Sequence, residues 1–221
     1  KQYDAGILTG KPLDFWGSKN RTEATGYGAV YFVKHLLTDL GETFEGKKAI
    51  VSGSGNVAIY AIEKLQELGA IPVTCSDSSG FIYDKDGIDL ALLKEIKEVK
   101  RERLTAYAKE RPSAEYHEGA SVWDFDTPAE LAFPCATQNE INLSQAKRAK
   151  ANGVRVVSEG ANMPSSLEAA EYFIEEGIFY CPGKAANAGG VAVSALEMSQ
   201  NSQRLQWEKA EVDAKLDDIM K

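Results

Sequence analysis

A short glycine-rich turn between an apolar run and an amphipathic helix constrains the fold of this chain most strongly. Residues 48–52 have the pattern of a buried strand, and apolar residues recur at helical spacing over 57–68. Between them lies Gly53-Ser-Gly-Asn-Val-Ala58. In the dinucleotide-binding fingerprint the first glycine permits a tight turn, the second lets the backbone approach a pyrophosphate, and a small third residue packs helix on strand. The pattern predicts a phosphate-binding turn at the positive end of a helix.

An acidic residue strengthens this interpretation, because glycines at a strand-to-helix turn can also be purely structural. A second apolar run, residues 71–76, follows the helix and ends at Asp77. This acid lies close to the offset of roughly 20 residues at which a carboxylate binds ribose hydroxyls. We therefore favour dinucleotide binding over a structural turn.

Strand-like runs alternate with helical segments after residue 47, which is typical of a doubly wound, Rossmann-like α/β fold with a mostly parallel sheet and helices on both faces. These runs are 48–52, 71–76, 131–135, 154–158 and 178–181. The length of 221 residues fits one large dinucleotide-binding domain, 1–221.

The remaining segments have weaker patterns. Residues 80–87 look like a small hairpin, and 89–111 predict an exposed helix ended by Pro112. Helical spacing also marks 22–37, 168–176, 188–203 and 208–221. In the first of these helices Gly26 and Gly28 indicate close approach of a ligand or of another backbone. The last helix continues to the final residue, so we expect the chain to be a fragment.

Composition argues against several classes of function. A net charge of −8 offers no footprint for nucleic acid, and no apolar run reaches the roughly 18 residues of a membrane span. We expect a cytoplasmic protein without a metal site. Cys75, Cys135 and Cys181 are far apart without a C-x-x-C spacing, so we interpret them as buried free thiols.

Amide side chains and small residues follow the last three strand-like runs. The segments are Cys135-Ala-Thr-Gln-Asn139, Glu159-Gly-Ala-Asn-Met-Pro164 and Pro182-Gly-Lys-Ala-Ala-Asn-Ala-Gly-Gly190. Ligands of open parallel sheets bind beyond the carboxyl ends of the strands. The carboxamides of Gln138, Asn139, Asn162 and Asn187 both donate and accept hydrogen bonds, which suits a nicotinamide carboxamide and ribose hydroxyls.

Candidate general bases are scarce. A hydride-transferring enzyme that acts on an amine or alcohol needs a base with a tuned pKa, and the only histidines are His35 and His117. We place His35 on a helix surface and His117 in a polar loop, both away from the site. Lys184 is the best-placed lysine, although a loop lysine is usually solvated.

Taken together, the motifs resemble the cofactor domain of hexameric bacterial glutamate dehydrogenase over nearly the whole chain. They are Arg21-Thr-Glu-Ala-Thr-Gly-Tyr-Gly28, Gly53-Ser-Gly-Asn-Val-Ala58, Pro134-Cys-Ala-Thr-Gln-Asn139, Glu159-Gly-Ala-Asn-Met-Pro164, Lys184-Ala-Ala-Asn-Ala-Gly-Gly190 and Glu197-Met-Ser-Gln-Asn201. The resemblance implies reversible oxidative deamination of L-glutamate to 2-oxoglutarate and ammonia, with hydride transfer to a nicotinamide cofactor.

Residue roles follow from the resemblance. It implies that Asn56 lies by the pyrophosphate and nicotinamide ribose, and that Thr25 and Asn139 meet the carboxamide end of the cofactor. It also implies that Ser194 binds the side-chain carboxylate of glutamate, with Val191 lining that pocket and Asn187 near the substrate. With the fingerprint and the strand-end amides, the expected cofactor-binding residues are Thr25, Gly53, Ser54, Gly55, Asn56, Val57, Asp77, Ser78, Lys97, Ala136, Thr137, Gln138, Asn139, Asn162 and Asn187.

The chain departs from the family in lacking its amino-terminal substrate domain and its last carboxy-terminal helices. The family's catalytic lysines and aspartate belong to that missing half, so no residue here is assigned a catalytic role. We expect this fragment to be inactive alone and monomeric, and its full-length parent to be a homohexamer. The alternatives are a sister dehydrogenase acting on leucine, phenylalanine or valine, for which Ser194 is unsuitable, and a non-enzymatic nucleotide sensor.

The choice of cofactor depends on charge near Asp77. This acid by itself favours NAD, because it would repel a 2′-phosphate. Hydroxyls of Ser76, Ser78 and Ser79 surround it, however, and Lys97 follows on the next helix. This arrangement also resembles NADP-dependent members of the family, so we predict NADP, with NAD as the alternative.

Overall fold

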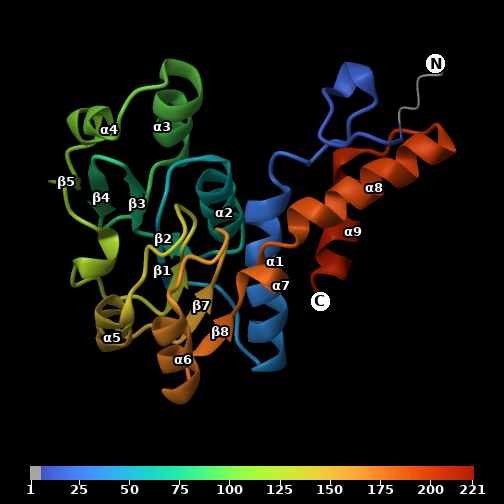
Figure 1. Ribbon diagram of the computed structural model, residues 1–221. Coiled ribbons are helices and arrows are strands. Elements are labelled where there is room, and N and C mark those ends of the chain that lie inside the picture. The colour runs from blue at the N-terminus through green and yellow to red at the C-terminus, as the bar shows by residue number, and fades with distance from the viewer. Residues whose placement is uncertain (1–5) are drawn as a thin grey trace.

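Five parallel strands form the sheet that carries the glycine turn. The computed structural model describes residues 6–221, and its main sheet has the order β2-β1-β6-β7-β8 (Figure 1). The strands are β1 (Lys48–Val51), β2 (Ile71–Pro72), β6 (Leu131–Phe133), β7 (Val156–Ser158) and β8 (Phe179–Cys181). β1 pairs in parallel with both β2 and β6. The chain therefore leaves β1 toward one edge of the sheet and later returns to β6 on its other side.

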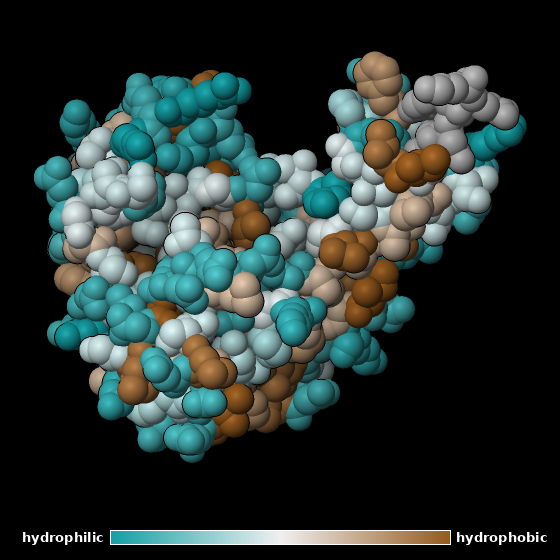
Figure 2. Space-filling model, viewed as in Figure 1, coloured by the Kyte–Doolittle hydropathy of each residue, from teal (hydrophilic) through white to brown (hydrophobic). Residues whose placement is uncertain are grey.

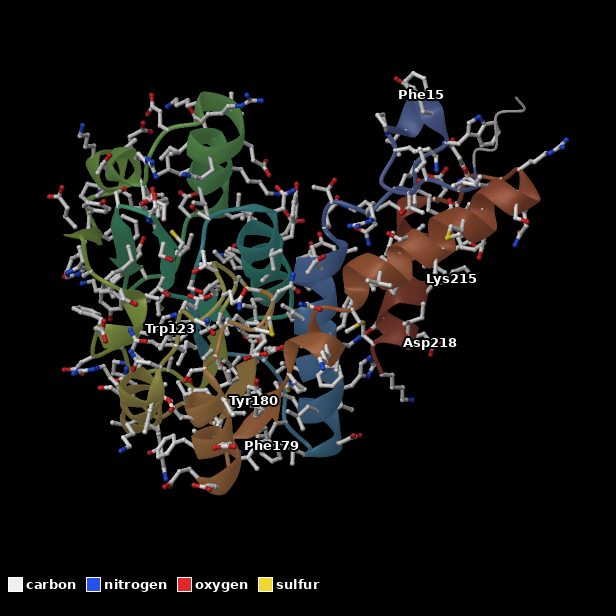
Figure 3. All side chains as sticks on the ribbon, in the orientation of Figure 1. Phe15, Trp123, Phe179, Tyr180, Lys215 and Asp218 are labelled. Carbon is white, nitrogen blue, oxygen red and sulfur yellow. The ribbon has the colours of Figure 1, made fainter. Side chains whose placement is uncertain are left out.

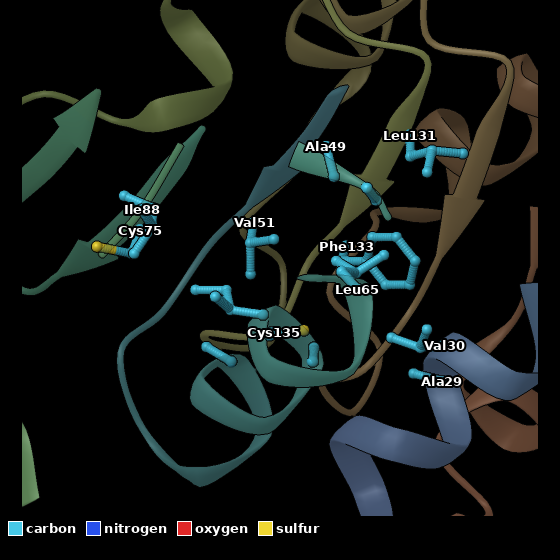
Figure 4. Close-up of a cluster of buried hydrophobic side chains, with 14 of the residues drawn as sticks. Ala29, Val30, Ala49, Val51, Leu65, Cys75, Ile88, Leu131, Phe133 and Cys135 are labelled. Carbon is cyan, nitrogen blue, oxygen red and sulfur yellow. The ribbon is translucent and has the colours of Figure 1, made fainter. Parts of the chain in front are cut away.

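Helices cover both faces of this sheet, as a doubly wound fold requires. The helices α1 (Ala24–Asp39) and α2 (Asn56–Glu67) share a core with Ala49, Val51 and Phe133 (Figure 4). The alternate residues of the strands, such as Ile50, Ala132 and Val157, pack in a second core with α5 (Leu143–Ala151) and α6 (Leu167–Glu175). Since side chains alternate across a strand, each strand contributes to both cores. The predicted fold class is confirmed.

A second, antiparallel sheet corrects the prediction for residues 71–76. β3 (Thr74–Asp77), β4 (Gly80–Asp84) and β5 (Ala114–Glu118) form this sheet in the order β3-β4-β5. The single run expected at 71–76 is thus split between two sheets. The Thr74 hydroxyl accepts a hydrogen bond from the N–H of Val51 and donates one to its carbonyl. A side chain of β3 thus takes the place of strand-to-strand backbone hydrogen bonds at Val51, where β3 diverges from β1.

Two further assignments around this sheet were wrong. Residues 80–87 do not form a hairpin by themselves, because β4 is the second strand of a hairpin that begins with β3. His117 lies in β5 rather than in a loop, and its ring stacks on Phe81 with centroids 4.6 Å apart.

The prediction of one exposed helix over 89–111 is also wrong. The segment contains α3 (Leu90–Lys94), the π-helix η2 (Glu95–Lys100) and α4 (Thr105–Glu110). The chain reverses at Arg101, which adopts the left-handed conformation with φ of 57°. Apolar side chains on these pieces are fully buried, namely Leu93, Ile96, Leu104 and Tyr107. Burial of all four side chains requires the reversal at Arg101, because one straight helix would lead away from the sheet.

The carboxy-terminal helices form an arm that packs against α1 (Figure 1). They are α7 (Gly183–Ala186), α8 (Gly189–Gln203) and α9 (Lys209–Ile219). With α1, the last two of them enclose a third core that includes Tyr27 and Leu216. A Cβ on Gly28 would lie 2.8 Å from the Cα of Gly189. Gly28 therefore serves helix–helix packing, one of the two predicted roles.

The arm also carries an amino-terminal loop with the short 3-10 helix η1 (Leu13–Phe15). The buried Glu197 carboxylate accepts hydrogen bonds from the N–H groups of Gly10 and Lys11. Asn201 donates to the carbonyl of Trp16. The Glu197–Asn201 motif thus ties this loop to α8. Figure 2 shows the wide notch between the arm and the lobe that carries the second sheet.

Candidate functional site

Gly53 makes the turn that leaves β1. Its φ of 87° lies in the left-handed region, which disfavours side chains, and a Cβ there would lie 2.9 Å from the carbonyl oxygen of Cys135. Its N–H donates to Ser76 Oγ at 2.7 Å, and its carbonyl accepts from Ser76 N–H. The first glycine of the fingerprint therefore has a structural role that joins three segments.

Gly55 differs in that it faces open space. It is the N-cap of α2, and a Cβ placed on it would meet no atom within 4 Å. Asn56, the first residue of α2, is exposed, whereas Val57 packs toward Gly160. The first N–H groups of a helix lack intrahelical partners and carry partial positive charge. This turn can therefore receive an anion that comes close to the backbone of Gly55.

A cavity of about 600 Å³ opens at this turn. Its wall consists of residues 53–55, 76–78, 119–122 and 135–137, with Gly80 and Glu140. The structure thus brings together seven of the predicted residues, namely Gly53, Ser54, Gly55, Asp77, Ser78, Ala136 and Thr137. Gly53 to Gly55 come from the end of β1, whereas Asp77 and Ser78 come from the end of β3.

The Asp77 carboxylate is largely occupied by the protein itself. One oxygen accepts from the N–H and hydroxyl of Ser79, and the other accepts from the N–H of Leu104 at 3.0 Å. Burial disfavours its charge, but these hydrogen bonds outweigh burial and lower the pKa of the Asp77 carboxyl. Asp77 therefore holds the turn after β3 against the start of α4, and fewer of its lone pairs remain for ribose hydroxyls than we expected.

Two basic side chains lie at the end of β3, one facing Asp77 and the other bonded to Ser78. Lys97 Nζ is 3.8 Å from the Asp77 carboxylate and donates to the carbonyl of Glu102. Arg103, which is exposed, donates from Nη1 to the hydroxyl of Ser78 on the cavity wall. Sequence reasoning missed Arg103, because residues 89–111 were interpreted as one exposed helix. Only the reversal at Arg101 brings this guanidinium back to Ser78.

The loop after β6 forms the opposite wall of the cavity. Ala136 and Thr137 are exposed there, and their N–H groups donate to the Glu140 carboxylate at 3.0 and 3.3 Å. Trp123, in the 3-10 helix η3 (Val122–Asp124), donates its indole N–H to the same carboxylate. Burial raises the pKa of Glu140 although these donors oppose the shift. Glu140 therefore shapes a loop that carries predicted site residues.

The other predicted amides lie beyond β6, β7 and β8, outside the wall of this cavity. Gln138 and Asn139 are exposed, and the Asn139 N–H donates to the carbonyl of Met163. Asn187 donates from Nδ2 to the Oδ1 of Asn162 at 2.9 Å. The structure thus pairs Asn162 with Asn187 and joins the β6 loop to the β7 loop.

Thr25, Val191 and Ser194 gather where α1 crosses α8. Gly190 approaches Thr25 so closely that a Cβ on the glycine would lie 2.5 Å from Thr25 Oγ1. Arg21 Nε donates to Ser194 Oγ at 3.0 Å, while Val191 is exposed on α8. Arg21 is a second residue missed as a site candidate, although it opens a motif noted in the sequence. Arginine and serine together suit the binding of a carboxylate.

The two parts of the site lie on either side of a topological switch point. The chain runs from β1 to β2 on one side and enters β6 on the other, and ligands of open α/β sheets bind at such a reversal. The cavity lies on the side of β1 and β3, and the paired amides lie on the side of β7 and β8. An extended ligand with two halves can therefore span the switch point.

The histidines and cysteines offer no alternative centre at this cavity. His35 Nε2 lies 3.0 Å from the Asp217 carboxylate on α9, and neither histidine lines the cavity wall. Cys75, Cys135 and Cys181 are free and buried, as expected. Within residues 6–221, no group of three or more His, Cys, Asp or Glu side chains could hold a metal ion. No helix in this part of the chain is long and apolar enough to cross a membrane.

Comparison with known sequences gives consistent matches. The family model described as Glutamate/Leucine/Phenylalanine/Valine dehydrogenase matches residues 17–221. An NAD(P)-specific glutamate dehydrogenase of Xylanibacter ruminicola is 59% identical over 218 residues, which is 97% of this chain and 48% of that protein. An NADP-specific glutamate dehydrogenase of Helicobacter pylori is 56% identical over 98% of this chain and 49% of its own length. The chain therefore spans about half the length of these curated relatives.

Solved structures agree with these matches. The crystal structure of Plasmodium falciparum glutamate dehydrogenase superposes with a TM-score of 0.93 at 48% identity, covering 96% of this chain and 46% of that one. A hetero-hexameric glutamate dehydrogenase from Thermus thermophilus has a TM-score of 0.80 at 25% identity, covering 98% and 49%.

Proposed function

The chain belongs to the glutamate/leucine/phenylalanine/valine dehydrogenase family, and we propose that it is the cofactor-binding half of an NADP-dependent glutamate dehydrogenase. The observation that carries this proposal is the cavity at the start of α2, where Gly55 leaves its backbone open to an anion. The full-length parent would oxidatively deaminate L-glutamate to 2-oxoglutarate and ammonia. When bound, the nicotinamide accepts the hydride in that reaction.

The proposed cofactor lies across the switch point of the sheet. Its pyrophosphate meets the N-terminus of α2 beside Gly55 and Asn56, and its adenosine half occupies the cavity between Ser78 and the β6 loop. Its nicotinamide half extends toward Asn139, Asn162 and Asn187. The residues present fit such a ligand, because the space beside Gly55 is open and the loop beyond β6 is exposed.

Arg103 supports NADP over NAD. Its guanidinium already contacts Ser78 on the cavity wall, where it can bind a 2′-phosphate in the geometry that arginine offers to phosphates. Asp77 would repel that phosphate less than a free carboxylate, because its oxygens accept neighbouring N–H groups and face Lys97. The relatives from Helicobacter pylori and Escherichia coli are named NADP-specific, and the one from Xylanibacter ruminicola NAD(P)-specific.

Ser194 and Arg21 support glutamate as the substrate. Their side chains are hydrogen-bonded to each other, so both can meet one distal carboxylate, with Val191 beside them. A leucine, phenylalanine or valine side chain carries no carboxylate, so it would bury the Arg21 guanidinium without an anionic partner, which costs binding energy. This contact disfavours the sister dehydrogenases. The contact also disfavours a nucleotide sensor without enzymatic activity, because a sensor would have no use for a carboxylate-binding pair at Arg21 and Ser194.

The same proposal has consequences for catalysis, assembly and location. The catalytic groups would come from the other half of the parent protein, so this chain by itself holds cofactor without turnover. We propose a homohexameric parent, a monomeric fragment and a cytoplasmic location. Three free and buried cysteines fit the reducing conditions of that compartment.

Titration with NADPH and NADH tests the cofactor assignment. Both nucleotides are fluorescent, and their dissociation constants for this chain can be measured under identical conditions. We expect NADPH to bind more tightly by about tenfold or more, since a charge-assisted contact to the 2′-phosphate contributes ~1.5–3 kcal/mol. A preference for NADH would contradict NADP as the cofactor. Binding of neither nucleotide would contradict the proposed site.

A further inference from the structure

Glu159 is a buried carboxylate at the carboxyl end of β7 that contacts three neighbouring segments. Its exposed fraction is 2%. One oxygen accepts from the Tyr180 hydroxyl at 2.8 Å and from the Ser165 N–H at 3.3 Å, and the other accepts from the Gly183 N–H at 2.8 Å. Figure 3 shows Tyr180 on β8. Glu159 therefore links the β7 loop to β8 and to the start of α7.

Both side-chain oxygens of Glu159 must accept hydrogen bonds in this arrangement. Two of the three donors, the N–H groups of Ser165 and Gly183, belong to the backbone and can only donate. The Gly183 N–H is the donor at the second oxygen. Burial and the hydrogen bond to Glu159 raise the pKa of the Tyr180 hydroxyl, so the phenol also remains a donor at neutral pH. A carboxylate meets this demand with both oxygens. A carboxamide can meet it with one only, because its NH₂ group would face a donor.

The segments held by Glu159 carry two predicted cofactor-binding amides. Asn162 lies three residues after Glu159, and Asn187 ends the turn of α7 that Gly183 begins. Asn187 Nδ2 donates to Asn162 Oδ1 and to the carbonyl of Ala161. A Cβ on Gly183 would lie 3.0 Å from that carbonyl. The two segments are thus in direct contact, and Glu159 is bonded to both of them.

We propose that Glu159 is a positioning residue that sets the mutual placement of Asn162 and Asn187 at the nicotinamide end of the cofactor site. This inference rests on the proposed function for the direction of the cofactor. It assigns Glu159 no contact with the cofactor itself. Loss of either acceptor oxygen removes part of the contact that fixes these segments, so the nicotinamide half should lose contacts while the adenosine half keeps the cavity beside Gly55.

The test compares NADPH with 2′,5′-ADP, which has the adenosine half and no nicotinamide. Glu159→Gln in this chain should weaken NADPH binding about tenfold or more, as expected when a buried donor loses a charged acceptor. It should also reduce the change in NADPH fluorescence on binding, which reports the surroundings of the nicotinamide. Binding of 2′,5′-ADP should be unchanged. The control is Glu197→Gln, which should bind NADPH like the wild type: Glu197 is likewise buried and accepts two backbone N–H groups, but on the arm, where it also pairs with Lys11.

Each outcome has a distinct meaning. If the wild-type chain binds neither ligand, the proposed function itself fails. If it binds both and Glu159→Gln binds both equally well, Glu159 does not position the amides. Equal weakening of both ligands would show a general effect on the fold and also overturn the inference. Should Glu159→Gln fail to fold, Tyr180→Phe removes only one of the donors, and it must weaken NADPH more than 2′,5′-ADP for the inference to hold.

Discussion

Two glycines in one turn have different physical roles at the residue scale. Gly53 has a positive φ and lies against the backbone of Cys135, so a side chain there would strain the fold. Gly55 has an ordinary φ of −89° and open space around its missing side chain. The second glycine therefore leaves room for the cofactor that we propose, whereas the first is required by the chain itself.

Substitution of these two glycines should separate binding from stability. Gly55→Val should abolish NADPH binding with little change in melting temperature, because the branched side chain projects into the space for the pyrophosphate. Gly53→Val should lower the melting temperature markedly, since it adds backbone strain to a clash. Melting curves and NADPH titrations of both variants check this. Unchanged affinity in Gly55→Val would assign that glycine a structural role only.

The proposed roles of Arg103 and Lys97 in selecting NADP can be tested by substitution. Arg103→Ala should weaken NADPH binding about tenfold or more and leave NADH binding unchanged, because a charge-assisted bond contributes ~1.5–3 kcal/mol. Lys97→Ala should also weaken NADPH binding, since it removes the cation that faces Asp77. Lys109→Ala, an exposed lysine on α4, is the charge control. If Arg103→Ala binds NADPH like the wild type, Arg103 has no part in selectivity.

The Ser194 hydroxyl should determine substrate choice in the full-length parent. Ser194→Ala removes a donor to the distal carboxylate, so the catalytic efficiency for glutamate should fall about ten- to hundredfold. The efficiency for norvaline, which has no such carboxylate, should change far less. Steady-state kinetics with both substrates measure this. Equal losses would place Ser194 outside the substrate pocket.

At the element scale, α1 is the helix that packs both against α2, which begins at the proposed cofactor site, and against the arm. A Cβ on Gly26 would lie 2.6 Å from backbone atoms of α2, and one on Gly189 would lie 2.1 Å from the carbonyl of Ala24. These glycines let three helices pack with their backbones almost in contact. The sequence predicted a close approach at Gly26 and Gly28 but could not distinguish a helix from a ligand.

This packing predicts a sensitive position on α8. Gly189→Ala should destabilise the protein by about 1–3 kcal/mol, because overpacking forces the two helices apart. Ser199→Ala, on the exposed side of the same helix, should have little effect. Urea denaturation of both variants measures the free energies of unfolding. A Gly189→Ala variant as stable as the wild type would show that α1 and α8 can separate without cost.

At the scale of the whole molecule, cofactor binding and catalysis should be separable. The chain contains the cavity, but neither histidine lines it. We expect the purified chain to bind NADPH and to show no glutamate-dependent reduction of NADP. Absorbance at the wavelength of the reduced nicotinamide measures this directly, with the full-length parent as the positive control. Sustained turnover by this chain alone would disprove the assignment of catalysis to the other half.

Four strands of the main sheet, the glycine turn after the first of them and the family resemblance could be predicted from the sequence. These features are local: the turn needs glycines in order between a strand and a helix, and each strand or helix shows its own periodicity over a few residues. The runs at 48–52, 131–135, 154–158 and 178–181 therefore led to β1, β6, β7 and β8 with small differences at their ends.

The contacts between charged side chains could not be predicted from the sequence, because they depend on how distant segments fold together. Arg103 reaches Ser78 because the chain reverses at Arg101, and Arg21 reaches Ser194 because α1 crosses α8. The split between β2 and β3 likewise depends on a hydroxyl of Thr74 that bonds to Val51 in another strand. Each contact joins residues that are distant along the chain, so no local periodicity encodes it. Burial of apolar faces brings these polar groups together only when the whole chain folds.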